Sequence, residues 1–225
     1  HTILATFHVS GSVSVTIEPL NARDLGRWRL TSGPDTAWKQ HGQVVQNFAP
    51  GANTLEFDST FGQSNWVVPD PTPIGIVTGV NHFTATYRYR VGTGQTLQAA
   101  IDAAGGGATI LVPPEVYHER IVIGHSVSLE AENPLDQPVI DGGGEGKPIF
   151  INSPATAIDV GILGLEIIGS GDGDSDGLGN GGIVAYVHPD ATLLLENSVV
   201  RQNKGNGITA MGSFTISNCI ITGCA

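Results

Sequence analysis

An acidic, glycine-rich segment in the second half of the chain could hold a metal ion. Its oxygen-bearing residues are Asp172, Asp174, Asp176 and Asn180. The three carboxylates alternate with small residues and could converge on one hard cation, while Gly177 permits the sharp turn that a calcium loop needs. The position where such a loop carries a bidentate glutamate is Ile183. We therefore expect either a calcium site that other residues complete or a solvated acidic loop.

A histidine at the first position suggests a second kind of metal chemistry. His1 presents an amine and an imidazole to one ion, and the segment 1–4 resembles the start of some copper monooxygenases. A further ligand could come from His8, His41 or His82, but no supporting pattern surrounds them. The alternative that His1 has no metal role is favoured.

Composition sets the fold class and excludes two classes of partner. The 225 residues include 31 glycines and 13 prolines but only 14% charged residues, which favours turns and packed strands over solvated helices. The net charge of −11 repels a phosphate backbone, so no nucleic-acid partner is expected. No apolar run approaches the ~20 residues of a membrane span, so none is expected.

The first part of the chain has the pattern of a β-sandwich. Residues 12–17, 53–57 and 83–87 alternate apolar and polar side chains with the period of two that a half-buried strand needs. Large residues that could fill the core or its edge, or instead form an aromatic strip on the surface, are Trp28, Trp38 and Trp66. The core position is the commoner one for tryptophan in a sandwich.

These runs, together with Gly26–Leu30 and Phe48–Phe57, resemble an Ig-like β-sandwich repeat of large bacterial surface proteins. The resemblance implies a non-catalytic spacer or adhesive module over residues 10–91. Residues 1–9 resemble the closing strand of a preceding copy, because 5–8 and 85–88 are alike. Either the chain is a piece of a tandem array, or this extra strand adds to a sheet edge of a neighbouring subunit.

A second domain is expected over residues 92–225. Its only helical pattern lies at 96–104, where Leu97, Ala100, Ile101 and Ala104 recur at helical spacing, and glycines at 105–107 end it. A strand at 108–112 and a proline turn follow. This stretch resembles the start of the right-handed parallel β-helix of the pectate-lyase and pectin-esterase superfamily, in which a short helix caps one end of the solenoid.

Two series of short apolar strands repeat through this domain, as a solenoid requires. The first recurs at 121–123, 149–151, 183–185 and 208–210, and the second at 127–129, 160–162, 193–195 and 214–216. Asn197 and Asn218 occupy matching turns, where stacked side-chain amides would hydrogen-bond along the solenoid. The predicted class is therefore all-β: a sandwich followed by a short right-handed parallel β-helix with one capping helix.

The resemblance implies lyases, hydrolases or esterases of acidic polysaccharides, yet the residues favour no catalysis. The main bases after the first coil are Arg120, Arg201 and Lys204. The acids outside the 172–176 loop, among them Glu130, Glu132 and Glu196, are scattered and match no active-site motif. Whether the chain is an enzyme is left open, with the residues favouring a non-enzymatic protein.

The last residues suggest assembly. The final strands carry no polar cap, so we expect an apolar face and open edges that further coils or another subunit would cover. Cys219 and Cys224 could form a disulfide, link subunits or remain buried thiols. We therefore expect an extracellular or cell-surface structural protein that forms filaments by strand addition and end-to-end stacking. The alternative is a β-helix that binds or cleaves a polysaccharide with calcium.

Overall fold

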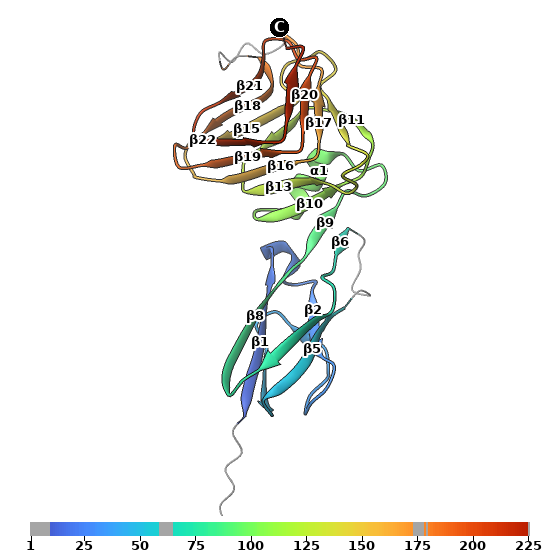
Figure 1. Ribbon diagram of the computed structural model, residues 1–225, viewed down its shortest axis with the longest axis vertical. Helices are drawn as coiled ribbons and strands as arrows, with labels where there is room; N and C mark the ends of the chain where they lie inside the picture. Colours follow the sequence, from blue (N-terminus) through green and yellow to red (C-terminus); the bar gives the residue numbers. More distant parts are fainter. Residues whose placement is uncertain (1–9, 59–64, 173–177, 179, 225) are drawn as a thin grey trace, which may run out of the picture. The chain divides into compact units, whose positions relative to one another are not determined.

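The chain is mostly β-structure in the computed structural model, which describes residues 10–58, 65–172, 178 and 180–224 (Figure 1). This confirms the prediction of an all-β class. The chain divides into two compact units, with the division between Tyr87 and Arg88. The sequence pattern placed the start of the second domain at residue 92. No helix among the described residues is long and apolar enough to cross a membrane.

The first unit contains two sheets. One has the order β4-β1-β8 and consists of β4 (Val44–Phe48), β1 (Gly11–Glu18) and β8 (Gly79–Thr86). The other has the order β3-β2-β5-β7 and consists of β3 (Lys39–Gln40), β2 (Arg27–Leu30), β5 (Gly51–Phe57) and β7 (Thr72–Ile76). The unit also holds the short helix η1 (Leu20–Ala22) and the strand β6 (Trp66–Val67).

Alternation along these strands builds the core of the first unit. Val13, Val15 and Ile17 of β1 are fully buried, as their period of two requires, and they share one apolar cluster with Trp28 of β2. The three tryptophans therefore differ in environment. Trp66 packs at the edge of this cluster, whereas Trp38 is 36% exposed and has the Arg29 guanidinium 4.5 Å from its ring centre.

The second unit contains three sheets of parallel strands, which the chain visits in turn. The first is β12 (Ile121–Ile123), β15 (Ile149–Ser153), β18 (Gly181–Val187) and β21 (Asn206–Ala210). The second, here the β10 sheet, includes β9 (Arg88–Arg90), β10 (Ala108–Val112), β13 (Val127–Ala131), β16 (Asp159–Leu163), β19 (Thr192–Glu196) and β22 (Ser213–Ser217). The third is β11 (Val116–His118), β14 (Val139–Asp141), β17 (Glu166–Ile168), β20 (Val199–Arg201) and β23 (Ile220–Thr222).

The register of these sheets matches the repeats that the sequence predicted. Ile121 pairs with Ile149, and Ile149 with Ile183, which in turn pairs with Ile208. The second series also pairs strand by strand, from 127 to 160, 193 and 214. One pass through the three sheets, here called a coil, therefore stacks on the next (Figure 1), and the register aligns their apolar residues. Leu129 and Leu195 on the inner side are fully buried.

The predicted helix is α1 (Leu97–Ala104), and its ends explain its length. The Thr96 hydroxyl accepts a hydrogen bond from the Ala99 amide at 3.1 Å, which is an N-cap. The Glu119 carboxylate accepts two more from the amides of Leu97 and Gln98, at 2.6 and 3.1 Å. Gly105, with φ of 72°, ends the helix.

Two turn positions recur from coil to coil. At each of them, a residue with positive φ precedes a residue whose side chain faces inward. The positive-φ residues are Gly164, Asn197 and Asn218 at one turn, and Gly169, Gln202 and Gly223 at the other. Asn218 Nδ2 donates to Asn197 Oδ1 at 2.6 Å, so the predicted asparagine stack is confirmed. The residues that follow Asn197 and Gln202, namely Ser198 and Asn203, are 1% and 2% exposed.

The two cysteines are free thiols. Cys219 Sγ lies 3.4 Å from the Leu195 carbonyl oxygen, and Cys224 Sγ lies 4.0 Å from that of Val200. Strand β23 separates the two thiols, so each stacks on a different part of the preceding coil. A disulfide between them, one of the three alternatives, is therefore wrong for this fold.

Two buried tyrosines predict how stability depends on alkaline pH. Burial raises the pKa of both Tyr87 and Tyr117 to about 12, and their hydroxyls donate to the carbonyls of Arg27 and Pro113. Their unfolded-state pKa is 10.0, so their contribution to stability is complete below pH 10 and is lost as the pH rises toward 12. We expect the melting temperature to fall through this window. In a spectrophotometric titration, Tyr117→Phe should remove part of the tyrosinate absorbance that develops near pH 12. An unchanged absorbance there would contradict the raised pKa of Tyr117.

Candidate functional site

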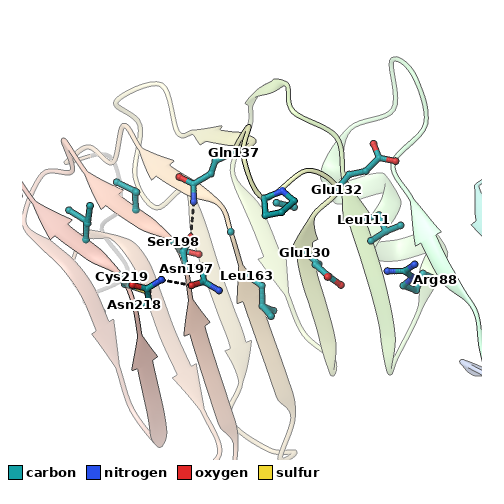
Figure 2. Close-up of a pocket in the computed structure, with 15 residues that line it drawn as sticks. Arg88, Leu111, Glu130, Glu132, Gln137, Leu163, Asn197, Ser198, Asn218 and Cys219 are labelled. Atoms are coloured by element: carbon teal, nitrogen blue, oxygen red, sulfur yellow. Dashed lines mark hydrogen bonds between the residues drawn. The ribbon is translucent and has the colours of Figure 1, made fainter.

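A groove of about 980 Å³ runs along the second unit, on the side where the β10 sheet turns into the β11 sheet (Figure 2). It crosses successive coils rather than lying within one. Its polar lining residues are Arg88, Glu130, Glu132, Gln137, Asn197, Ser198 and Asn218. Leucines at 111 and 163 lie between them.

Three side chains on the floor of the groove, Leu111, Glu130 and Leu163, belong to a row of aligned residues at the ends of the strands. Leu111 pairs with Glu130, Glu130 with Leu163, and Leu163 with Glu196. We call these four residues the Leu/Glu row, in which Glu196 continues one strand beyond the three that line the groove. Because adjacent strands lie about 4.8 Å apart, the two glutamates are separated by roughly 10 Å along the axis. Glu130, Leu163 and Glu196 are half-buried.

One wall of the groove is the loop of residues 132–138, which joins β13 to β14. The equivalent connections in the next two coils contain only two residues, 164–165 and 197–198, so this loop projects beyond them. Arg90 holds its start by donating to both carboxylate oxygens of Glu132, at 2.5 and 2.7 Å. Gln137 Nε2 holds its end by donating to the Asn197 carbonyl at 2.7 Å (Figure 2). The wall is therefore fixed at both ends.

The same pairing sets the charge of the wall. Hydrogen bonds from Arg90 lower the pKa of the Glu132 carboxyl, and Glu132 in turn raises the pKa of the Arg90 guanidinium. Glu132 therefore remains an anion at neutral pH and already has its partner.

Other charged groups in the groove are available to a ligand. Within the described part of the chain, neither the Glu130 carboxylate nor the Arg88 guanidinium makes a hydrogen bond or ion pair. In Figure 2, Glu130 lies beside Leu163 in the β10 sheet, and Arg88 is on β9, two register positions from their row. The side chains of Asn197 and Asn218, bonded to each other once, retain further donors and acceptors. Such an arrangement can bind hydroxyl, amide or charged groups repeated along a linear molecule.

The residues of the expected calcium loop have different outcomes. Asp174 and Asp176 lie outside the described residues. Asp172 forms an ion pair with Lys204, and the buried Asn180 Oδ1 has no hydrogen-bond partner among the residues that the structure describes. Those residues contain no cluster of three or more His, Cys, Asp or Glu side chains that could hold a metal ion. The calcium site stays a prediction.

Other residues considered for chemistry have structural partners. Arg201 pairs with Glu166 at 2.5 Å, and Lys204 with Asp172. The Ile17 amide donates to His41 Nδ1 at 3.0 Å. The ring nitrogens of His82 are 2.9 and 2.8 Å from the hydroxyl oxygens of Ser14 and Thr16. His1 and His8 lie outside the described residues.

The sequence did not indicate the groove, and Glu130, Glu132 and Glu196 stand in it as scattered acids. A usable signal was present, because Glu130, Leu163 and Glu196 each follow an aligned strand of the second series by one residue. The loop at 132–138 gave no comparable signal, since its role depends on the coils beside it. None of three comparisons, with protein-family models, with curated proteins and with solved structures, finds a match to this chain.

Proposed function

We propose that this protein is a non-enzymatic extracellular or cell-surface protein that binds a linear polysaccharide in the groove. In this proposal, residues 10–91 form an Ig-like sandwich that acts as a spacer. Residues 92–225 form a right-handed parallel β-helix similar to that of the pectate-lyase and pectin-esterase superfamily. The observation that carries the proposal is the groove across successive coils, lined by a fixed loop and by polar groups available to a ligand.

The shape of the groove favours a linear polymer over a compact ligand. Its lining residues extend from Arg88 on β9 to Asn218, which follows β22. Each further strand along the sheet lengthens the groove by about 4.8 Å. Chemically similar groups therefore recur along the axis, which suits a ligand with its own repeat. A small molecule would contact only one or two coils.

The backbone of the groove favours a glycan over an extended peptide. A peptide that adds to a sheet needs free backbone donors and acceptors. Here the turn amides already bond between coils: the Gly164 amide donates to the Glu196 carbonyl at 2.9 Å, and the Asn197 amide to that of Ser217 at 3.1 Å. Recognition is left to side-chain amides, carboxylates and a guanidinium, which match the hydroxyl groups of a sugar chain.

The charges in the groove favour binding over cleavage. Glycoside hydrolysis needs one carboxylic acid that keeps its proton at working pH. Arg90 keeps Glu132 ionised, because it lowers the pKa of that carboxyl. The groove therefore supplies an anion at this position and not a proton donor.

A binding assay with a matched pair of variants tests the proposal. Calorimetry should detect one or more soluble polysaccharides from a panel of neutral, acidic and amino-bearing chains, without release of shorter products. Leu163→Arg places a long side chain on the groove floor and should abolish binding. Val122→Arg, at a 49% exposed outward position of β12, should leave binding unchanged. Absence of binding to the whole panel, or equal losses in both variants, would contradict the proposal. Binding that a chelator abolishes would instead favour the calcium-dependent alternative.

A second candidate function, self-association into filaments, has an observation of its own. Inward positions in β22 and β23 are exposed: Ile216 by 47% and Ile221 by 45%, whereas the aligned Leu195 and Val200 are fully buried. Another coil stacked on these strands would cover them. Light scattering over a concentration series tests this. We expect assemblies that Ile221→Lys disrupts, and a wild-type monomer at all concentrations would contradict it.

A further inference from the structure

We propose that the groove selects a glycan that carries amino groups, with the Leu/Glu row as its recognition element. This inference rests on the proposed function and adds the chemical class of the ligand. The row alternates an apolar side chain and a carboxylate, Leu111, Glu130, Leu163 and Glu196, in consecutive register positions. An extended 1,4-linked glycan has a disaccharide repeat comparable to the roughly 10 Å between the two glutamates.

The surroundings of Glu130 explain why a cation is preferred. Its neighbours in register on both sides are leucines, and no described residue donates to its carboxylate. A ligand that lies over Glu130 removes water from this carboxylate, which is unfavourable unless the ligand returns a strong donor. An ammonium group forms a charge-assisted hydrogen bond and also supplies a positive charge that compensates the carboxylate, whereas a neutral hydroxyl leaves the negative charge uncompensated. The flanking leucines can meanwhile contact the apolar faces of the sugar rings.

The other charges of the groove and of the whole chain also favour a cationic ligand. Glu132 belongs to the groove and is held in its anionic form by Arg90. The whole chain carries a net charge of −11 and therefore attracts cationic polymers. A polyuronate in the groove would bring its carboxylates against Glu130 and Glu132. Arg88, a lining cation that has no partner among the described residues, lies at the first strand of the groove and can donate a hydrogen bond to a hydroxyl or acetamide oxygen there.

Three hexasaccharides of the same linkage separate the effect of charge from that of shape. These are the 1,4-linked glucosamine hexamer, its fully N-acetylated counterpart and the glucose hexamer, each measured by calorimetry at about pH 5.5, where glutamate is ionised and the amino sugar is protonated. We expect the glucosamine hexamer to bind at least about tenfold more tightly than the other two. Its affinity should fall with added salt, whereas that of the glucose hexamer should not.

A pair of carboxylate variants tests whether Glu130 is responsible for the preference for the glucosamine hexamer. Glu130→Gln keeps the shape of the side chain and should weaken glucosamine hexamer binding by about tenfold to a hundredfold, the equivalent of one charge-assisted hydrogen bond. It should hardly change binding of the glucose hexamer. Glu145→Gln makes the same charge change at an exposed turn between β14 and β15 and should leave both affinities unchanged. Circular dichroism checks that both variants are folded.

Each result decides a different point. If the three hexamers bind equally, or if Glu130→Gln changes nothing, the amino preference is overturned while polysaccharide binding stands. If a polyuronate binds more tightly than the glucosamine hexamer, the preference is also overturned. If oligolysine binds as tightly and depends equally on Glu130, the groove recognises cations in general and the assignment to a glycan fails. If no glycan binds, the proposed function itself fails.

Discussion

Trp28→Ala is expected to destabilise the first unit by about 3–5 kcal/mol, the range for removal of a fully buried aromatic side chain. Trp28 is 0% exposed and belongs to the apolar cluster of the two facing sheets. Its indole Nε1 also donates to the Gln40 carbonyl at 3.0 Å, which joins β2 to β3. The substitution therefore leaves a cavity and removes one hydrogen bond to the Gln40 carbonyl, which also accepts from the Gln43 amide at 3.2 Å.

Hydrogen exchange of the β1, β2 and β5 amides measures this loss strand by strand. Trp38→Ala is the matched control, because Trp38 is 36% exposed and the Arg29 guanidinium lies over its ring. We expect it to cost about 1 kcal/mol or less. Equal losses in the two variants would contradict the assignment of Trp28 to the core and Trp38 to the surface.

Asn203→Ala should destabilise the second unit by about 2–4 kcal/mol, because it leaves several buried backbone groups without partners. Asn203 is 2% exposed. Its Oδ1 accepts from the Ser170 amide at 2.9 Å, and its Nδ2 donates to the carbonyls of Ile167 and Arg201, both at 3.0 Å. These bonds join two successive coils at one corner.

Urea unfolding followed by circular dichroism measures this effect. Asn152→Ala, on the exposed side of β15, is the control and should change stability by no more than about 0.5 kcal/mol. A similarly small change in Asn203→Ala would mean that the amide of Ser170 and the carbonyl of Ile167 find other partners. The Asn203 side chain would then not be one of the groups that hold the coils together.

Local patterns predicted most of the elements because each depends on a short stretch of chain. The period of two marked β1, and the helical spacing between Thr96 and Gly105 marked α1, both of which the structure contains. The register of the parallel strands was also predictable, since each coil must align its apolar residues with those of the next. The asparagine stack followed from matching turns.

Patterns in the sequence could not distinguish residues whose environment depends on distant segments. Trp28 and Trp38 have the same side chain but differ in burial, because only one lies between the two sheets. The Asn203 side chain hydrogen-bonds to three backbone groups in two successive coils. The repeats in the sequence nevertheless indicated only Asn197. Cys219 and Cys224 are close in sequence, but β23 keeps their thiols apart.

The sequence by itself determined the mostly β character, the capped helix, the alignment of the coils and the charge that disfavours nucleic acid. Each of these depends on composition or on spacing within a coil. Apart from the Asn197–Asn218 pair, the tertiary structure alone decided which polar residues meet. Glu130 and Glu196 become members of one row only when coils stack, and Gln137 reaches Asn197, 60 residues away, only because the connections at 164–165 and 197–198 are short. A groove between coils is a property of stacking, and no single segment of the chain contains it.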